Sequence, residues 1–196
     1  MLKRSFDIVF SLLGLILLSP VFMSVALAIA LKDGFPVFFK QKRIGKGGKT
    51  FYLYKFRTMS TSIDCDRQLS NQAEARITPL GKQLRYYKLD ELPQLLNVMK
   101  GEMSFVGYRP EIPYYVEKYN DFQKQILEYK PGIVDPATLK FSRFENELLA
   151  TSEDVEKDYI QKVLPTKLSM SLNYAKNASI FSDLKCIWQC FIHLTK

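Results

Sequence analysis

Two adjacent carboxylates, Asp90 and Glu91, are the residues of this chain whose types and spacing could do chemistry. They stand directly before Leu92-Pro93 and an apolar run. Pro93 has no amide hydrogen and suits only the first turn of a helix, so we expect Asp90 near the N-cap and Glu91 in the first turn. Negative charge is favoured there, so Asp90 should stay ionised, as a carboxylate nucleophile or metal ligand must be. The alternative is a helix cap without chemistry.

The chain is basic, and part of its basic charge is concentrated in one region. Lys and Arg number 28 against 20 Asp and Glu, a formal charge of +8. This favours an anionic partner, which could be nucleic acid, a phosphate-bearing substrate or a membrane surface. No acidic residue occurs from 34 to 63. Within that region, 37–39 and 51–56 predict short strands, and the glycine- and lysine-rich turn 45–49 suits phosphates or lipid head groups.

Two further motifs could contact a phosphorylated substrate. Gly107-Tyr108-Arg109-Pro110 predicts a tight loop that can present a guanidinium fork to phosphate, or else a surface arginine in a turn. Asp64 and Asp66 lie one residue apart and could hold a divalent metal on a nucleotide sugar. Their polar surroundings, 60–74, favour a solvated loop instead.

The number and spacing of the cysteines and the histidine argue against several classes of site. The three cysteines, Cys65, Cys186 and Cys190, are odd in number and lack metal-ligand spacing with the single His193. We therefore expect neither a zinc site nor a histidine-based triad. Cys186 and Cys190 lie in an apolar segment and are expected to pack as small hydrophobic residues.

An uncharged run of 24 residues, 8–31, follows the N-terminus. It is too long for the apolar region of a usual secretory signal. As one straight helix it would measure about 36 Å, enough to cross a hydrocarbon core of about 30 Å. Pro20 at its midpoint removes the hydrogen bond to the Ile16 carbonyl, and the Ser19 hydroxyl can replace part of it. Basic residues flank both ends, so a hairpin returning to the cytoplasm satisfies the positive-inside tendency better than a spanning helix. These residues alone leave both arrangements open.

The remaining periodicities predict a mainly α chain with short β elements. Thr78-Pro79 opens a helix that ends near Lys88, and the helix after Asp90 stops at Gly101. Residues 111–130 predict one amphipathic helix. Residues 180–194 predict another, either in the core or in the membrane interface with Trp188 at head-group depth.

Three ordered motifs resemble the bacterial sugar transferase family, the small monotopic phosphoglycosyl transferases. They are KFRTM at 55–59, LDELPQL at 89–95 and GEMSFVGYRP at 101–110. PGI at 131–133 and the tail 174–185 fit the same family, so the resemblance covers essentially the whole chain.

The resemblance implies transfer of a sugar-1-phosphate from a UDP-sugar to undecaprenyl phosphate, with undecaprenyl-diphosphate-sugar and UMP as products. It implies that Asp90 is both the nucleophile, carrying the phosphosugar covalently, and a ligand of Mg²⁺. Glu91 would assist orientation or proton handling. The substrate-phosphate-binding positions that it implies are Arg85, Arg109, Lys55 and Arg57.

The resemblance also favours the hairpin, because the re-entrant helix of the family breaks at a Ser-Pro pair like Ser19-Pro20. We expect a re-entrant membrane helix-break-helix anchor over 1–33 and a compact cytoplasmic catalytic domain with interfacial amphipathic helices over 34–196. This places a monotopic enzyme on the cytoplasmic face of the bacterial inner membrane. The expected partners are the UDP-sugar, undecaprenyl phosphate and anionic lipids, with no nucleic acid; no oligomeric state is predicted.

The sequence departs from the family pattern at two places, and two other functions compete. Tyr108 stands where the family usually has proline, and 134–144 diverges in a region that could contact the donor. One competing function is a membrane-anchored basic adaptor without catalysis. The other is a metal-dependent glycosyltransferase that uses Asp64 and Asp66 and releases UDP.

Overall fold

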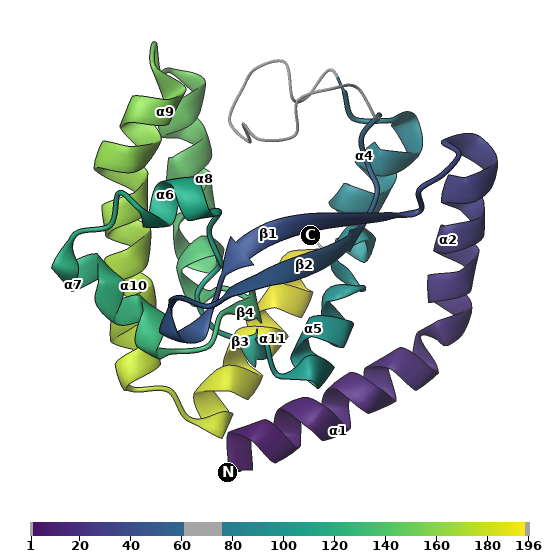
Figure 1. Cartoon of the computed structure of the whole chain (residues 1–196), viewed down its shortest axis with the longest axis horizontal. Helices are drawn as coiled ribbons and strands as arrows, with labels where there is room; N and C mark the ends of the chain where they lie inside the picture. The colour runs from purple at the N-terminus through teal and green to yellow at the C-terminus, as the bar shows by residue number, and fades with distance from the viewer. Residues whose placement is uncertain (1, 61–75, 195–196) are drawn as a thin grey trace.

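The computed structural model describes residues 2–60 and 76–194 as a mainly helical chain with short strands, as predicted (Figure 1). In Figure 1 the β1–β2 ribbon lies between the α1–α2 pair and the helices α8 to α10. The helices are α1 (Leu2–Leu17), α2 (Ser19–Lys32), α4 (Pro79–Tyr86), α5 (Gln94–Lys100), α6 (Pro113–Val116), α7 (Asp121–Lys124), α8 (Pro136–Ala150), α9 (Val155–Asp158), α10 (Leu164–Lys176) and α11 (Ile180–Leu194). The strands are β1 (Phe38–Ile44), β2 (Thr50–Phe56), β3 (Ser104–Val106) and β4 (Gly132–Val134).

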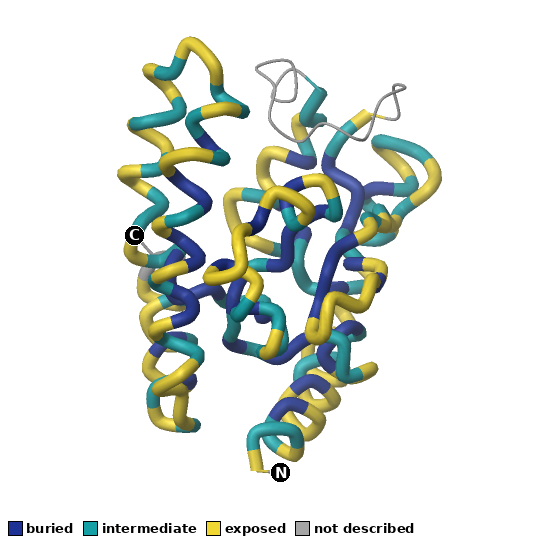
Figure 2. Tube along the Cα trace, turned by 60° about the vertical axis from the view of Figure 1, so that its left-hand side comes forward, coloured by how far each residue is buried: buried dark blue, intermediate teal, exposed yellow. Residues whose placement is uncertain are grey.

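The predicted break at Ser19-Pro20 is confirmed. Helices α1 and α2 meet there at a bend of 61°. The Ser19 hydroxyl donates to the Ile16 carbonyl oxygen at 2.7 Å, which replaces the hydrogen bond that Pro20 cannot make. Within the described ranges no single helix is long and apolar enough to cross a membrane, whereas the bent pair taken together is. Figure 2 shows exposed and buried residues interspersed along α1, near the N-terminus.

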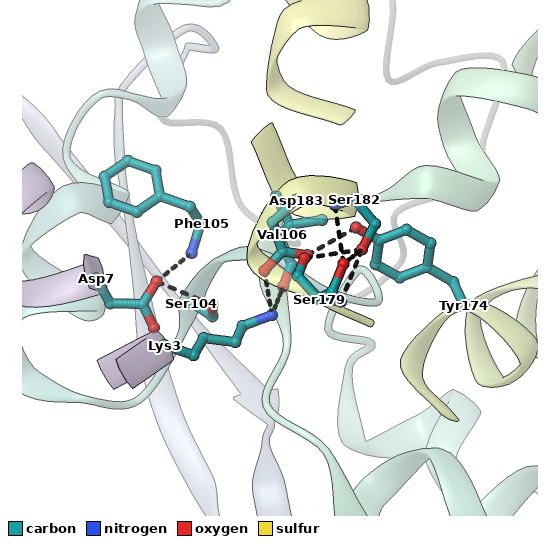
Figure 3. A network of polar contacts seen from close by, with 9 residues as sticks. All are labelled: Lys3, Asp7, Ser104, Phe105, Val106, Tyr174, Ser179, Ser182 and Asp183. Carbon is teal, nitrogen blue, oxygen red and sulfur yellow. Dashed lines mark hydrogen bonds and ion pairs between the residues drawn. The ribbon is translucent and has the colours of Figure 1, made fainter. Parts of the chain in front are cut away.

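Polar contacts join α1 to the opposite end of the chain (Figure 3). Lys3 Nζ lies 2.7 Å from the buried Asp183 Oδ2 on α11, and Tyr174 Oη donates to the other oxygen of Asp183 at 2.7 Å. The buried Asp7 accepts a hydrogen bond from Ser104 Oγ on β3 at 3.0 Å. Because buried carboxylates need such partners, these contacts give α1 a defined position against the rest of the protein.

The β1–β2 ribbon carries the predicted strands and turn. Its antiparallel register runs from the pair Phe38–Phe56 to the pair Ile44–Thr50. Asn97, a fully buried residue of α5, accepts from the Tyr54 amide at 3.1 Å and donates to the Tyr52 carbonyl at 2.7 Å. These two bonds set β2 against α5, and so fix where Lys55, the next residue of β2, can reach.

The short strands β3 and β4 pair in parallel and approach unusually closely just beyond Val106. A Cβ built on Gly132 would lie 2.0 Å from the Gly107 nitrogen, so only glycine fits this crossing. The Gly107 amide also donates to the Val134 carbonyl at 3.1 Å. The crossing therefore fixes the backbone two residues before Arg109.

The single helix predicted over 111–130 is wrong. The structure has α6, α7 and a 3₁₀ turn, Gln125–Glu128, in its place. Asn120 causes the interruption, because its side chain accepts from the Gln123 amide while Gln123 Oε1 accepts from the Asn120 amide. Such a reciprocal cap starts a new helix.

Helix α11 covers the residues predicted for it. It is neither fully buried nor fully exposed, since Cys186 and Asp183 are buried while Trp188 and Phe181 are exposed. The largest apolar cluster lies elsewhere, among residues of the 108–129 segment and the α8–α10 helices. Its buried members are Tyr108, Ile112, Tyr115, Tyr119, Ile126, Tyr159, Val163, Leu164, Leu168 and Leu172.

Candidate active site

Asp90 and Glu91 lie in one 3₁₀ turn, Leu89–Glu91, and not in the first turn of an α-helix. Lys88 enters this turn with a left-handed backbone, φ 55°, and α5 begins only at Gln94, after Pro93. The expectation of Asp90 near the N-cap and Glu91 in the first turn of the helix is wrong, because the N-cap of α5 is Pro93 and both carboxylates precede it. Pro93 occupies the N-cap position with α-type torsions, so the turn continues into α5 without a break at Asp90.

Glu91 forms ion pairs with two of the predicted phosphate-binding side chains. Its Oε1 lies 2.7 Å from Lys55 Nζ and 3.0 Å from Arg109 Nη2. The side chains of Glu91 and Lys55 are 14% and 18% exposed, so this cluster is screened from water, while Arg109 is 38% exposed. Burial alone would raise the pKa of Glu91, but the charges of Arg109 and Lys55 outweigh it and hold that pKa well below its usual range. The ionised form of Glu91 is therefore favoured, and its Oε1 holds the Lys55 and Arg109 side chains together.

Asp90 is buried, and one of its carboxylate oxygens lacks a hydrogen-bond partner among the described residues. It is 6% exposed, and its Oδ1 has no hydrogen-bond partner in the described part of the chain. Burial raises the pKa of Asp90, a direction opposite to the one expected from a helix N-terminus, and the positive charge of Lys55 opposes this rise. A buried polar oxygen without a partner costs free energy unless a ligand satisfies it. A ligand of the Asp90 carboxylate would satisfy this oxygen, which is itself buried from solvent.

The other two predicted phosphate-binding arginines have different surroundings. Arg85, on α4, donates from Nε to Thr58 Oγ1 at 2.9 Å, and its charge lowers the pKa of Asp90, so it lies within electrostatic reach of the site. Arg57 is buried, and its Nη2 donates to the Asp33 and Gly34 carbonyl oxygens at 2.5 and 2.6 Å. Arg57 thus holds the end of α2 rather than joining the Glu91 cluster.

The structure brings together Asp90, Glu91, Lys55 and Arg109 from three separate segments of the chain. Asp64 and Asp66 lie outside the described residues, so the competing metal site is untested. Among residues 2–60 and 76–194, no group of three or more His, Cys, Asp and Glu side chains could hold a metal ion. Mg²⁺ does not need such a group, since it commonly binds one or two carboxylates together with substrate phosphates.

One residue near the site, Arg43, was not predicted for it and belonged only to the region 34–63 that lacks acidic residues. The structure buries Arg43 at 4% exposure, 3.7 Å from Glu111 Oε2. Strand alternation was the available signal, because Phe39, Gln41 and Arg43 share the less exposed face of β1. A charged residue on that face requires a partner, and the sequence did not reveal which one.

A buried carboxylate beside a lysine–glutamate–arginine cluster is the kind of site that handles phosphate groups. The model of the bacterial sugar transferase family matches residues 1–196, and the chain belongs to this family.

Known relatives cover nearly all of the chain. It is 38% identical over 186 residues to the uncharacterized sugar transferase EpsL of Bacillus subtilis, covering 95% of this chain and 83% of EpsL. It is 35% identical over 193 residues to the UDP-glucose:undecaprenyl-phosphate glucose-1-phosphate transferase of Escherichia coli, covering 96% of this chain but 39% of that protein. It is 32% identical over 189 residues to the UDP-N-acetylgalactosamine-undecaprenyl-phosphate N-acetylgalactosaminephosphotransferase of Aeromonas hydrophila, covering 96% and 42%. The chain thus spans most of EpsL and about two fifths of the other two.

Proposed function

We propose that this protein transfers a sugar-1-phosphate from a UDP-sugar to undecaprenyl phosphate, which gives undecaprenyl-diphosphate-sugar and UMP. The observation that carries the proposal is the buried Asp90, whose Oδ1 lacks a partner, beside a Glu91 that aligns Lys55 and Arg109. The printed names of two relatives, which contain a UDP-sugar and undecaprenyl phosphate, support the choice of donor and acceptor.

In the first step an oxygen of the Asp90 carboxylate attacks the β-phosphorus of the UDP-sugar. The bond from that phosphorus to the oxygen bridging the α- and β-phosphates breaks, and UMP leaves with the bonding electrons. Asp90 then carries the phosphosugar as an acyl phosphate. Lys55 and Arg109 offset the negative charge that otherwise keeps a carboxylate away from a diphosphate, and Glu91 keeps both cations in place.

In the second step an oxygen of undecaprenyl phosphate attacks the same phosphorus. The bond from phosphorus to the Asp90 carboxylate oxygen breaks, which restores the carboxylate and releases undecaprenyl-diphosphate-sugar. A covalent intermediate allows the soluble donor and the membrane lipid to bind in separate steps, so the two substrates need not be bound at the same time.

The residues present fit the Mg²⁺ ion that the family resemblance implies. One oxygen of the Asp90 carboxylate would be a ligand of the ion while the other acts as the nucleophile, and phosphate oxygens of the donor would be further ligands. When bound, the ion supplies positive charge that neutralises the diphosphate. Arg85, which lies within electrostatic reach of Asp90, adds a further positive charge.

The bent α1–α2 pair supports a membrane anchor, with 1–33 entering one leaflet and 34–196 remaining on the cytoplasmic face. Ser19 and Pro20 would mark the deepest point of the anchor. The exposed face of α11, with Trp188, would lie at head-group depth. The exposed lysines of β1 and its turn would attract anionic lipids; they are Lys40, Lys42, Lys46 and Lys49.

The test is nucleotide release by the purified, detergent-solubilised protein with undecaprenyl phosphate, Mg²⁺ and a panel of UDP-sugars. We expect UMP from the parent and from Asp121→Asn, a control at an exposed aspartate, and none from Asp90→Asn. Without undecaprenyl phosphate, the intact mass of the parent should rise by one phosphosugar. Release of UDP, with loss of activity in Asp64→Ala, would favour the glycosyltransferase alternative and reject the proposal. Binding of lipid without any nucleotide release would favour the adaptor.

A further inference from the structure

A second buried polar cluster includes Glu111, two residues after Arg109. Glu111 Oε1 accepts a hydrogen bond from Tyr159 Oη at 2.6 Å, and Glu111 Oε2 lies 3.7 Å from Arg43 Nη1. All three side chains are buried, with residue exposures of 7%, 6% and 4%. A charged group costs free energy in such surroundings unless it is paired, so each of the three depends on the others.

The three residues come from distant parts of the chain. Arg43 belongs to β1, Glu111 follows Arg109-Pro110, and Tyr159 begins a π-helical turn, Tyr159–Val163, between α9 and α10. A π-turn adds one residue to a helix, is rare, and often occurs near functional sites. Here it lies at the point where the Tyr159 hydroxyl reaches a carboxylate 48 positions earlier in the chain.

The contacts of this cluster hold the backbone immediately after Arg109. Arg43 Nη1 donates to the Pro110 carbonyl oxygen at 2.8 Å, and the Ile44 amide donates to the Glu111 carbonyl oxygen at 3.0 Å. The close backbone contact between Gly107 and Gly132 holds the backbone before Arg109. The backbone is therefore held both before and after Arg109, and the Arg109 guanidinium extends from this loop to Glu91.

Two neighbouring tyrosines show that burial of a phenol in this core does not require such a bond. Tyr108 and Tyr119 belong to the same apolar cluster as Tyr159 and are 3% and 4% exposed. Their hydroxyl oxygens have no hydrogen-bond partner in residues 2–60 and 76–194. The hydroxyl of Tyr159, in contrast, is paired with the carboxylate that adjoins the Arg109 loop.

We propose that Tyr159 and Glu111 are positioning residues that set the Arg109 guanidinium for phosphosugar transfer, an inference that rests on the proposed function. Removal of the Tyr159 hydroxyl frees one oxygen of Glu111, so the carboxylate re-orients toward Arg43 and draws the Arg43 guanidinium away from the Pro110 carbonyl. The loop that carries Arg109 then loses its hydrogen bond from Arg43, and only the Ile44 amide still holds the backbone after Arg109 in the way described above. Small misplacements of a charge that stabilises a transition state cost far more in rate than in folding.

The experiment compares Tyr159→Phe with Tyr119→Phe, the same substitution in the same core at a hydroxyl without a partner. Single-turnover release of UMP from a UDP-sugar, with Mg²⁺ and without acceptor, gives two quantities. The burst amplitude reports the fraction of folded, competent protein, and the rate constant reports the position of the catalytic groups. We expect Tyr159→Phe to keep its amplitude while its rate constant falls on the order of tenfold or more, and Tyr119→Phe to keep both.

Each alternative outcome has a separate meaning. A lower amplitude with an unchanged rate constant in Tyr159→Phe would show a purely structural role and overturn the inference, as would equal rate constants in the two variants. If Tyr159→Phe does not fold, Glu111→Gln, which keeps the size of the side chain, is expected to show the same loss of rate. A parent protein that releases no UMP with any donor would contradict the proposed function itself, whatever the variants do.

Discussion

Lys55 Nζ lies 2.7 Å from Glu91 Oε1, a contact between residues that are 36 positions apart in the chain. Arg109 reaches the same oxygen, so Glu91 is shared by two cations. The pKa of Glu91 is held well below its usual range, and a carboxylate that remains ionised cannot donate a proton at neutral pH. The contacts with Lys55 and Arg109 are those that an orienting role for Glu91 would use.

The first prediction concerns Glu91→Gln, which keeps the shape of the side chain but removes its charge. Lys55 and Arg109 would then face each other as like charges and separate. We expect the rate of UMP formation to fall on the order of a hundredfold, since the groups that meet the diphosphate lose their alignment. The matched control is Glu147→Gln, whose side chain is 65% exposed and pairs only with the exposed Arg143, and it should retain full activity. Full activity in Glu91→Gln would show that its alignment of Lys55 and Arg109 is dispensable.

Local signals in the sequence predicted several elements correctly. Thr78 accepts from the Gly81 amide and caps α4, which starts at Pro79 as expected. Gly101 ends α5 with φ 87°, a backbone conformation that favours glycine. The Ser19 hydroxyl bonds the Ile16 carbonyl at the bend. Each of these features depends on residues within four positions of one another, so the sequence contains the whole cause.

The errors arose where a competing local contact or a distant partner decides. Asn120 and Gln123 form a reciprocal cap that splits the expected helix over 111–130, although the apolar spacing is helical. For the site, the resemblance named Lys55 and Arg57 together, and strand alternation would place both on one face, but β2 ends at Phe56, so Arg57 lies beyond the strand. Lys55 meets Glu91, whereas Arg57 meets the end of the anchor. Periodicity alone could not identify either partner.

The second prediction concerns the bend at Pro20. Pro20→Ala restores the amide hydrogen, so α1 and α2 can continue as one helix long enough to cross a bilayer. With Leu2→Cys as the only cysteine, a membrane-impermeant maleimide should leave intact cells unlabelled when Pro20 is present. We expect labelling to appear in Pro20→Ala. The control is Pro79→Ala, at the start of the non-membrane helix α4, which should stay unlabelled. Labelling of the Pro20 parent would contradict the hairpin.

The third prediction concerns the crossing of β3 and β4. Gly132→Ala places a methyl group against backbone atoms of Val106 and Gly107, which cannot move aside as a flexible side chain can. Overpacking of this kind costs about 1–3 kcal/mol, and each kcal/mol lowers the melting temperature of a chain of this size by about 2–4 °C, so we expect a fall of about 2–12 °C. Gly14→Ala is the control, because its added Cβ meets only the Leu95 side chain at 3.3 Å, and its melting temperature should change little. Equal melting temperatures for both variants would mean that β3 and β4 do not cross this closely.

The last prediction uses Cys186, a buried thiol on the inner side of α11. Burial raises its pKa from 9.0 to about 11, because the thiolate is poorly solvated there, and the Asp135 carboxylate contributes in the same direction. Only the thiolate reacts with iodoacetamide, so a Cys65→Ser/Cys190→Ser variant should be alkylated slowly at neutral pH, and the rate should keep rising about tenfold per unit between about pH 8 and pH 10. A thiol with the ordinary pKa would instead level off near pH 9. Mass spectrometry of the alkylated protein measures the rate, and the same variant unfolded in urea supplies the ordinary profile. If the folded protein gave the urea profile, Cys186 would be exposed and α11 would not pack against β3, β4 and α8 as it does in the structure.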